Sequence, residues 1–280
     1  MVSKIKVHGA PSTDSTRAVK ALSSCRRTYG EDYDMSLVSI EQHGDCLHIV
    51  LNRPSKLNAL SPDLLQELID AIEELKTRPV PIIVVRGAGR AFSAGADLLL
   101  FGQALMGPNA REMADLGRRA CQAVASLTQL TVATIDGPCI GGGIALALNC
   151  DLRWATKNSH FAMPELPTGI PVGWGAIEQM VDTLGVNITK ELVYTGKRLS
   201  SSEARQIGLL GQVFEDKDGF EDGLAQLAKI PRSTLEATHR QFAAVRDGTY
   251  DAHMDADIMV ASTKDPAVVS SLFDKWQKHT

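Results

Sequence analysis

Short apolar runs that end in glycine-rich turns recur along this 280-residue chain, each separated from the next by a helix-forming segment. The run from Ile82 to Val85 is continuously apolar and ends at Gly87, and the run from Thr131 to Ile135 is followed by Gly137. Continuous apolar runs are typical of strands buried on both faces of a parallel sheet. Strands that alternate with helices favour an α/β fold, in which the residues just after the strands face a site.

Turn and capping residues predict the elements around these runs. Leu37 to Gln42 and Cys46 to Leu51 form a hairpin, because His43-Gly44-Asp45 separates two β-prone runs. Ser61-Pro62-Asp63 starts a helix that runs to about Thr77. Strands are also expected over 152–155 and 210–214, and helices over 109–127, 141–150, 176–184, 189–194, 200–207, 220–229, 233–246, 252–262 and 266–278.

The chain is predicted to have three parts: an N-terminal extension over 1–35, a core domain over 36–215 and a helical region for oligomerisation over 216–280. The extension is rich in Ser, Thr, Lys and Arg. This composition fits a solvated leader with one short helix near 16–28, or a transit peptide. A cytoplasmic location is therefore expected, with the mitochondrial matrix as the alternative.

Composition makes several classes of protein improbable. A formal net charge of -4 without long charged blocks argues against a nucleic-acid surface, and the apolar runs are too short to span a membrane. The five cysteines include no C-x-x-C pair, and the seven histidines have no metal-binding spacing. We therefore expect structural thiols in a reducing compartment and no metal.

Two segments of small residues follow predicted strands, namely Ala91 to Asp97 and Gly141 to Gly143. Backbone N–H groups at such turns can point toward a ligand. Ser93 does not complete a serine-nucleophile motif, because Ala91 stands where a glycine is needed and no His-Asp pair has a supporting context. The glycines also do not complete a dinucleotide or P-loop motif, so both of those sites are disfavoured.

The chain resembles the enoyl-CoA hydratase/isomerase (crotonase) family in four motifs that occur in the family's order: Leu51-Asn52-Arg53-Pro54 with Asn58-Ala59-Leu60, then Ala91 to Asp97, Gly141 to Gly143, and Pro164-Glu165-Leu166 with Gly169. The resemblance covers about Leu37 to Gly211. It implies a crotonase-like spiral of repeated β-β-α units and a helical C-terminal region that builds homotrimers or dimers of trimers. It also implies an acyl-CoA substrate, with coenzyme A as part of the substrate and no separate cofactor.

The same resemblance assigns roles to individual residues. The N–H groups of Ala96 and Gly142 would form an oxyanion hole for the thioester oxygen, and Glu165 would transfer the proton. Coenzyme A would be bound by Arg53, Lys56, Leu57, Ala59, Ala94, Asp97, Leu98 and Leu99, with the first two directed at its phosphates. Apart from the resemblance, Met106, Met113, Met163 and Trp174 could line an acyl pocket, although core packing explains each of them equally well. Of the four, Trp174 in the glycine-rich stretch after Glu165 is the preferred substrate contact.

One position departs from the hydratase pattern. Hydratases of the family carry a second glutamate two positions after the glycine triplet, where this chain has Ala145, and alanine cannot accept a proton. A single carboxylate can still remove a proton from one carbon and return it to another. We therefore expect a hydratase/isomerase-like enzyme that forms an enolate, with Glu165 as its single general acid/base.

The sequence leaves several alternatives open for the second acid and for the function. A substitute acid could be Glu112 or Asp115, although a solvated helix face is the favoured interpretation of both. The dienoyl-isomerase subtype is disfavoured, because Val172 and Gly173 stand where its further acid would be. The remaining alternatives are a non-catalytic acyl-CoA-binding homologue and a hydrolase of coenzyme A thioesters.

Overall fold

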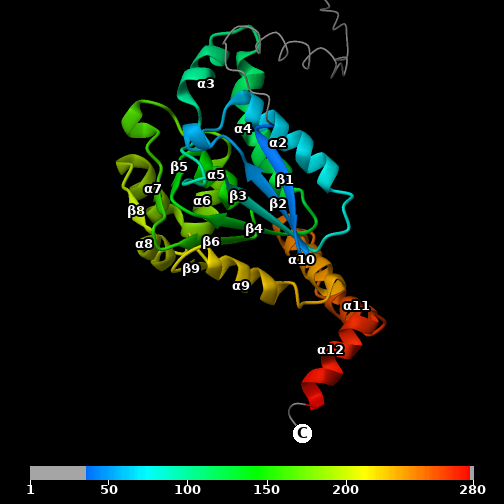
Figure 1. Ribbon diagram of the computed structural model, residues 1–280. Helices are drawn as coiled ribbons and strands as arrows, with labels where there is room; N and C mark the ends of the chain where they lie inside the picture. The colour runs from blue at the N-terminus through cyan, green and yellow to red at the C-terminus, as the bar shows by residue number, and fades with distance from the viewer. Residues whose placement is uncertain (1–35, 278–280) are drawn as a thin grey trace, which may run out of the picture. The chain divides into compact units, whose positions relative to one another are not determined.

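The computed structural model describes residues 36–277, so the extension predicted over 1–35 and its short helix lie outside the described residues. Figure 1 shows a large sheet with helices packed against it and a smaller sheet beside it. The large sheet has the order β1-β2-β3-β4-β6-β9. Its strands are β1 (Val38–His43), β2 (Cys46–Leu51), β3 (Ile82–Gly87), β4 (Leu130–Ile135), β6 (Leu152–Thr156) and β9 (Gln212–Phe214).

Strand directions in the large sheet follow from the connections. The predicted hairpin is confirmed, because β1 and β2 pair antiparallel with His43 opposite Cys46. The pairs β2·β3, β3·β4, β4·β6 and β6·β9 are all parallel. Parallel neighbours need crossover connections, and helices supply several of these. The α/β prediction is therefore confirmed.

The small sheet was not predicted. Its order is β5-β7-β8, and it consists of β5 (Pro138–Ile140), β7 (His160–Ala162) and β8 (Leu199–Ser200). Strands of two or three residues are too short to show a period in the sequence. Their pairing matters for function, because β5 leads directly into the glycine triplet and β7 ends just before Glu165.

The helix α2 (Pro62–Leu75) shows how local sequence sets an element. The Ser61 hydroxyl accepts the Leu64 N–H at 3.2 Å, and Pro62 occupies the first helical position, as predicted. The other helices are α3 (Leu98–Leu105), α4 (Ala110–Ala125), α5 (Gly142–Leu148), α6 (Ala176–Leu184), α7 (Val186–Thr195), α8 (Ser201–Gln206), α9 (Asp218–Leu227), α10 (Arg232–Arg246), α11 (His253–Ser262) and α12 (Pro266–Gln277), with short 3-10 turns η1 (Pro54–Lys56) and η2 (Leu166–Thr168).

The run over 82–85 is continuously apolar because β3 is buried on both faces. Ile83 and Val85 belong to the larger apolar cluster, together with buried residues of α2, α4 and α5. Ile82 and Val84 belong to a second cluster, which Phe220 of α9 helps to cover. Alternate side chains of one strand thus enter two different cores.

The C-terminal helices carry large apolar side chains on their surface. The exposed ones on α10, α11 and α12 are Phe242, Val245, Met259, Val260, Leu272 and Phe273. They are compatible with the predicted oligomerisation region, which stays a prediction. Within residues 36–277 we find no helix with the length and apolar character to cross a bilayer.

His48 lies at the centre of β2 and is 3% exposed, and neither ring nitrogen has a hydrogen-bond partner within the described chain. Burial lowers the pKa of His48 from 6.5 to about 4, helped by His43 and Arg86 and opposed by Glu41. The unfolded chain therefore binds more protons than the folded one between these pH values. We expect the free energy of unfolding to fall as pH drops from 6.5 to 4, by about 3 kcal/mol in total from this residue.

Chemical denaturation of wild type and His48→Leu at several pH values tests this expectation. The variant should lose the contribution of His48 to the pH dependence in this window, because no proton is then gained on unfolding at that position. His253→Leu is the matched control, since His253 is exposed on α11 and should leave the wild-type pH dependence in place. An unchanged slope in His48→Leu would contradict the assignment.

Candidate active site

The Ala96 segment runs beside Leu60 in an extended conformation. The Leu60 N–H donates to the Gly95 carbonyl at 2.8 Å, and the Asp97 N–H donates to the Leu60 carbonyl at 3.0 Å. Successive peptide groups of an extended chain point to opposite sides. The Ala96 N–H therefore faces away from Leu60, and no acceptor for it occurs within residues 36–277.

The Gly142 N–H lies on the neighbouring segment. Gly141 turns the chain with a φ of 50° and a ψ of -116°, and Gly142 is the first residue of α5. The first N–H groups of a helix have no partner inside the helix. A Cβ placed on Gly95 would lie 2.8 Å from the Ile140 oxygen and 3.5 Å from the Gly142 nitrogen, so the two small-residue segments are in contact.

The Glu165 carboxylate lies against Gly141. The Gly141 N–H donates to the Ala162 carbonyl at 2.9 Å, which ties the glycine turn to the end of β7. A Cβ on Gly141 would come within 2.3 Å of Glu165 Oε1. Only glycine at this position leaves room for the carboxylate, and the positive φ also favours glycine.

The environment of Glu165 favours the protonated form of its carboxyl group. Its Oε2 is buried and has no hydrogen-bond partner among the residues described. Burial raises the pKa of Glu165, partly offset by the backbone N–H of the same residue. A carboxyl group with a raised pKa in a partly dry site suits general acid/base chemistry.

The Trp174 side chain packs against the start of α5 and against α4. A Cβ on Gly142 would lie 2.2 Å from the indole ring, and a Cβ on Gly117 of α4 would lie 2.0 Å from it. The Phe101 ring of α3 is 5.6 Å away, centroid to centroid. Trp174 has a φ of 61°, which is unusual for a bulky residue and indicates that the packing holds it there.

Sequence reasoning missed Gly117 and Phe101, and it gave Gly141 no role of its own within the glycine segment. A glycine in the middle of a predicted helix is a weak signal, because it costs about 1 kcal/mol relative to alanine. The structure gives the reason for Gly117, since any larger side chain would overlap the Trp174 ring. Phe101 had no comparable signal in the sequence.

Arg53, which was predicted to meet a phosphate of coenzyme A, is engaged with Asp97 and Ala59, and its phosphate contact stays a prediction. Its side chain is 5% exposed, and its guanidinium donates to Asp97 at 2.6 Å and to the Ala59 carbonyl at 3.2 Å. The Asp97 side chain is 14% exposed, and its second oxygen accepts the Leu100 N–H at 3.2 Å. The two charged groups are thus paired with each other, and the predicted contacts of both residues with coenzyme A stay predictions.

The other residues predicted to bind coenzyme A lie on η1, on the loop that follows it, in the Ala96 segment and at the start of α3. The Ala94 N–H donates to the Leu57 carbonyl at 2.9 Å, which places the loop over 57–59 beside the Ala96 segment. Ala59 is half-buried, and Lys56 is exposed on η1. Leu98 and Leu99 are exposed at the start of α3.

The three methionines named as possible acyl-pocket residues differ in exposure. Met106 is 91% exposed, and Met163 is fully buried in the main apolar cluster, so core packing explains the second one. Met113 is half-buried on α4. The role of Trp174 and of these methionines in an acyl pocket stays a prediction.

The candidate substitute acids have different surroundings from Glu165. Arg118 binds both oxygens of Asp115 at 2.6 Å, and its guanidinium lowers the pKa of that carboxyl group. Glu112 is exposed on the first turn of α4. A general acid needs a raised pKa near neutral pH, and the ion pair with Arg118 shifts the pKa of Asp115 in the opposite direction.

Ala145 is buried within α5, two residues after the glycine triplet. Its methyl group offers neither a donor nor an acceptor. Val172 packs against the main core, and Gly173 has no side chain. The hydratase pattern would place a second carboxylate at position 145, and the dienoyl-isomerase pattern at position 172 or 173. This chain has no carboxylate at any of the three.

Comparisons with known proteins identify the family of this chain. Residues 41–271 match the family described as enoyl-CoA hydratase/isomerase. A crotonyl-CoA hydratase of Syntrophomonas wolfei is 32% identical over 183 residues, which cover 65% of this chain and 70% of that protein. A peroxisomal Delta(3,5)-Delta(2,4)-dienoyl-CoA isomerase of Arabidopsis thaliana is 32% identical over 194 residues, with 65% and 70% covered.

A solved structure shows the same fold. The enoyl-CoA hydratase of Thermoplasma volcanium superposes with a TM-score of 0.78 at 29% identity, covering 88% of this chain and 99% of that one. This match confirms the crotonase-like architecture predicted from the four motifs. The chain belongs to the enoyl-CoA hydratase/isomerase family.

Proposed function

We propose that this chain acts on an unsaturated acyl-CoA thioester, with the N–H groups of Ala96 and Gly142 binding the thioester oxygen and Glu165 transferring the proton. The observation that carries the proposal is the position of Glu165. Its Oε2 is buried without a partner within the described chain, and its Oε1 lies against the glycine that precedes Gly142.

The two N–H groups are suited to a charge that develops during the reaction. Removal of a proton next to a thioester carbonyl moves negative charge onto the carbonyl oxygen, which becomes an enolate. Hydrogen bonds to that oxygen are therefore stronger in the transition state than in the bound substrate. Each such donor typically contributes about 3 kcal/mol to the lowering of the barrier.

Glu165 alone is sufficient for a shift of a double bond. We infer that its carboxylate takes a proton from C2 of a 3-enoyl-CoA, which gives a dienolate held by the two N–H groups. The same carboxyl group returns the proton to C4, and the product is a 2-enoyl-CoA. Each step is a proton transfer, so no cofactor beyond the coenzyme A of the substrate is proposed.

Hydration is the second candidate, because a relative 32% identical to this chain is named as a crotonyl-CoA hydratase. A two-carboxylate mechanism would need a second acceptor for the water, and Ala145 cannot supply it. Hydration by this chain would thus depend on Glu165 alone. Isomerisation makes fewer demands on the residues present.

The first experiment is incubation of the protein with 3-enoyl-CoA and, separately, with 2-enoyl-CoA, while the absorbance of the conjugated thioester is followed. Isomerisation predicts a rise with the 3-enoyl substrate, and hydration predicts a fall with the 2-enoyl substrate. Release of free coenzyme A thiol would indicate the hydrolase alternative. Binding of acyl-CoA without any of these changes would overturn the proposal in favour of a non-catalytic binding protein.

Assembly and location stay predictions. Homotrimers or dimers of trimers are implied by the family resemblance, and the apolar side chains on the C-terminal helices are compatible with them. The cytoplasmic or mitochondrial location depends on residues 1–35. Gel filtration with light scattering would test the first prediction, and fractionation of cells would test the second.

A further inference from the structure

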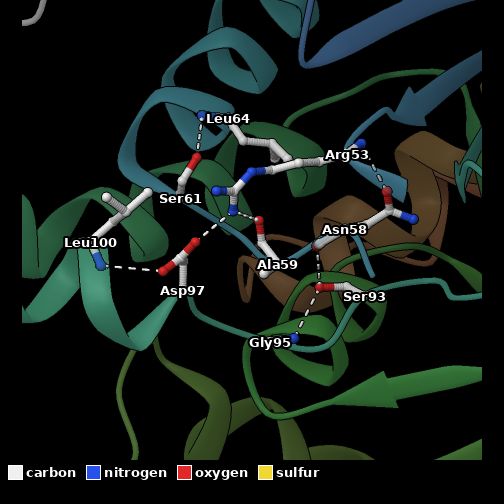
Figure 2. Close-up of polar contacts among 9 residues, drawn as sticks. All are labelled: Arg53, Asn58, Ala59, Ser61, Leu64, Ser93, Gly95, Asp97 and Leu100. Carbon is white, nitrogen blue, oxygen red and sulfur yellow. Dashed lines mark hydrogen bonds and ion pairs between the residues drawn. The ribbon is translucent and has the colours of Figure 1, made fainter. Parts of the chain in front are cut away.

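Polar side chains hold the Ala96 segment on both sides without involving Ala96 itself (Figure 2). On one side, the Arg53 guanidinium binds Asp97 at 2.6 Å and the Ala59 carbonyl at 3.2 Å. Asp97 also caps α3 through the Leu100 N–H. The residue that follows Ala96 is therefore fixed to a helix and to the loop over 57–59.

On the other side, the Ser93 hydroxyl accepts the Gly95 N–H at 3.1 Å and donates to the Asn58 carbonyl at 2.9 Å. The Ser93 side chain is completely buried. The residue that precedes Ala96 is thus also fixed to the loop over 57–59. Figure 2 shows Ser93 between Asn58 and Gly95.

Asn58 links the two sides. Its Oδ1 accepts the Arg53 N–H at 2.9 Å, and its Nδ2 donates to the carbonyls of Ala88 and Ala91 at 2.8 Å each. Asn58 is completely buried and has a φ of 54°. A buried amide with these three hydrogen bonds specifies one conformation of the surrounding loops.

We propose that Ser93 and Asp97 are positioning residues for the Ala96 N–H, and that Arg53 and Asn58 hold them in place. The proposal rests on the proposed function, in which this N–H binds the thioester oxygen. An N–H group stabilises a developing charge only where it is held within about 0.5 Å of its productive position. The backbone bonds of Gly95 and Asp97 to Leu60 turn the Ala96 N–H away from Leu60, and the Ser93 and Asp97 side chains add bonds that hold the same two neighbours.

Capping of α3 by Asp97 does not by itself account for the hydrogen bonds around Ala96. Capping explains the bond from the Leu100 N–H to Asp97. It does not explain the bond between Ser93 and Gly95, or the bond between Arg53 and the Ala59 carbonyl. These contacts converge on the residues that flank Ala96 and on the loop beside them.

The test compares Ser93→Ala and Asp97→Asn with Ser201→Ala. The first variant removes the acceptor for Gly95, and the second keeps the size of the side chain while it removes the charge that faces Arg53. Ser201 is the matched control, because its buried hydroxyl bonds to the carbonyls of Thr156 and Ser159 instead. Circular dichroism and thermal unfolding of all three proteins establish that they are folded.

The informative readout is the stretching frequency of a bound thioester carbonyl. The probe is butyryl-CoA with carbon-13 at the carbonyl, which is saturated and cannot isomerise, measured by isotope-edited infrared difference spectroscopy. Wild type and Ser201→Ala should shift the band to lower frequency on binding. Ser93→Ala and Asp97→Asn should lose at least about half of that shift. Their kcat should fall about 10-fold, with KM changed less than about 3-fold. The reason is that a displaced N–H donor stabilises the developing charge on the oxygen less than a correctly placed donor does.

The outcomes distinguish the positioning role of Ser93 and Asp97 from the oxyanion role of the Ala96 N–H. If the wild type shifts the band and both variants keep the full shift and kcat, the residues are structural only and the positioning proposal fails. If the wild type binds butyryl-CoA without any shift, the oxyanion role itself fails and the positioning role with it. The two variants act on opposite sides of Ala96, so misfolding of one leaves the other decisive.

Discussion

Replacement of Glu165 by Gln is expected to lower kcat for the double-bond shift by about 10²- to 10⁴-fold, the range typical for loss of a general acid/base group. Gln keeps the size of the side chain, so the cavity beside Gly141 should stay filled. It cannot take up and return a proton. Binding of acyl-CoA should change little, and the measurement is steady-state kinetics with 3-enoyl-CoA together with titration of a saturated acyl-CoA.

Glu112→Gln is the matched control for this variant. Glu112 is the other carboxylate considered as an acid, and it is exposed on α4. The control should keep wild-type kcat. Equal activity of Glu165→Gln and wild type would overturn the catalytic assignment, and a large loss in Glu112→Gln would transfer the acid role to α4.

The raised pKa of Glu165 makes a linked prediction for stability. The folded state binds this proton more tightly than the unfolded state, because burial disfavours the carboxylate. The stabilising contribution is therefore complete at low pH and is lost as pH rises through the folded-state pKa. Glu165→Gln should remove this loss, so its stability relative to wild type should increase with pH in that window.

Much of the large sheet could be predicted from local sequence. Ser61 and Pro62 fixed the start of α2, and the apolar run over 82–85 indicated a strand buried on both faces. These features depend on neighbours within a few residues. The small sheet could not be predicted in this way, because its strands have two or three residues and exist only through pairing with distant segments.

The site was predictable only in part, for a similar physical reason. The motifs indicated Ala96, Gly142 and Glu165, and the structure places their segments in contact around Gly141. The pairing of Arg53 with Asp97 joins residues 44 positions apart, and an arginine in a loop is usually solvated. The sequence therefore suggested a solvated Arg53 directed at a phosphate and gave no sign that its guanidinium pairs with Asp97.

Gly142→Ala is expected to lower kcat by about 10²- to 10³-fold, comparable to the loss of one oxyanion donor. The backbone of Gly142 can accept an alanine, since its φ is not positive. The new methyl group would lie 2.2 Å from the Trp174 ring, so either the ring or the start of α5 must move. Movement of α5 displaces the Gly142 N–H, and the infrared shift of a bound thioester carbonyl measures that displacement.

Gly117→Ala separates the two possible movements. Its methyl group would lie 2.0 Å from the same ring, but Gly117 is on α4 and contributes no N–H to the proposed site. If displacement of Trp174 alone lowers activity, both variants should be equally impaired and should keep the carbonyl shift. If displacement of the donor is the cause, only Gly142→Ala should lose the shift, and Trp174→Ala in the same chain should restore part of it by giving the methyl group room. Retention of full activity and full shift in Gly142→Ala would contradict the oxyanion role of this residue.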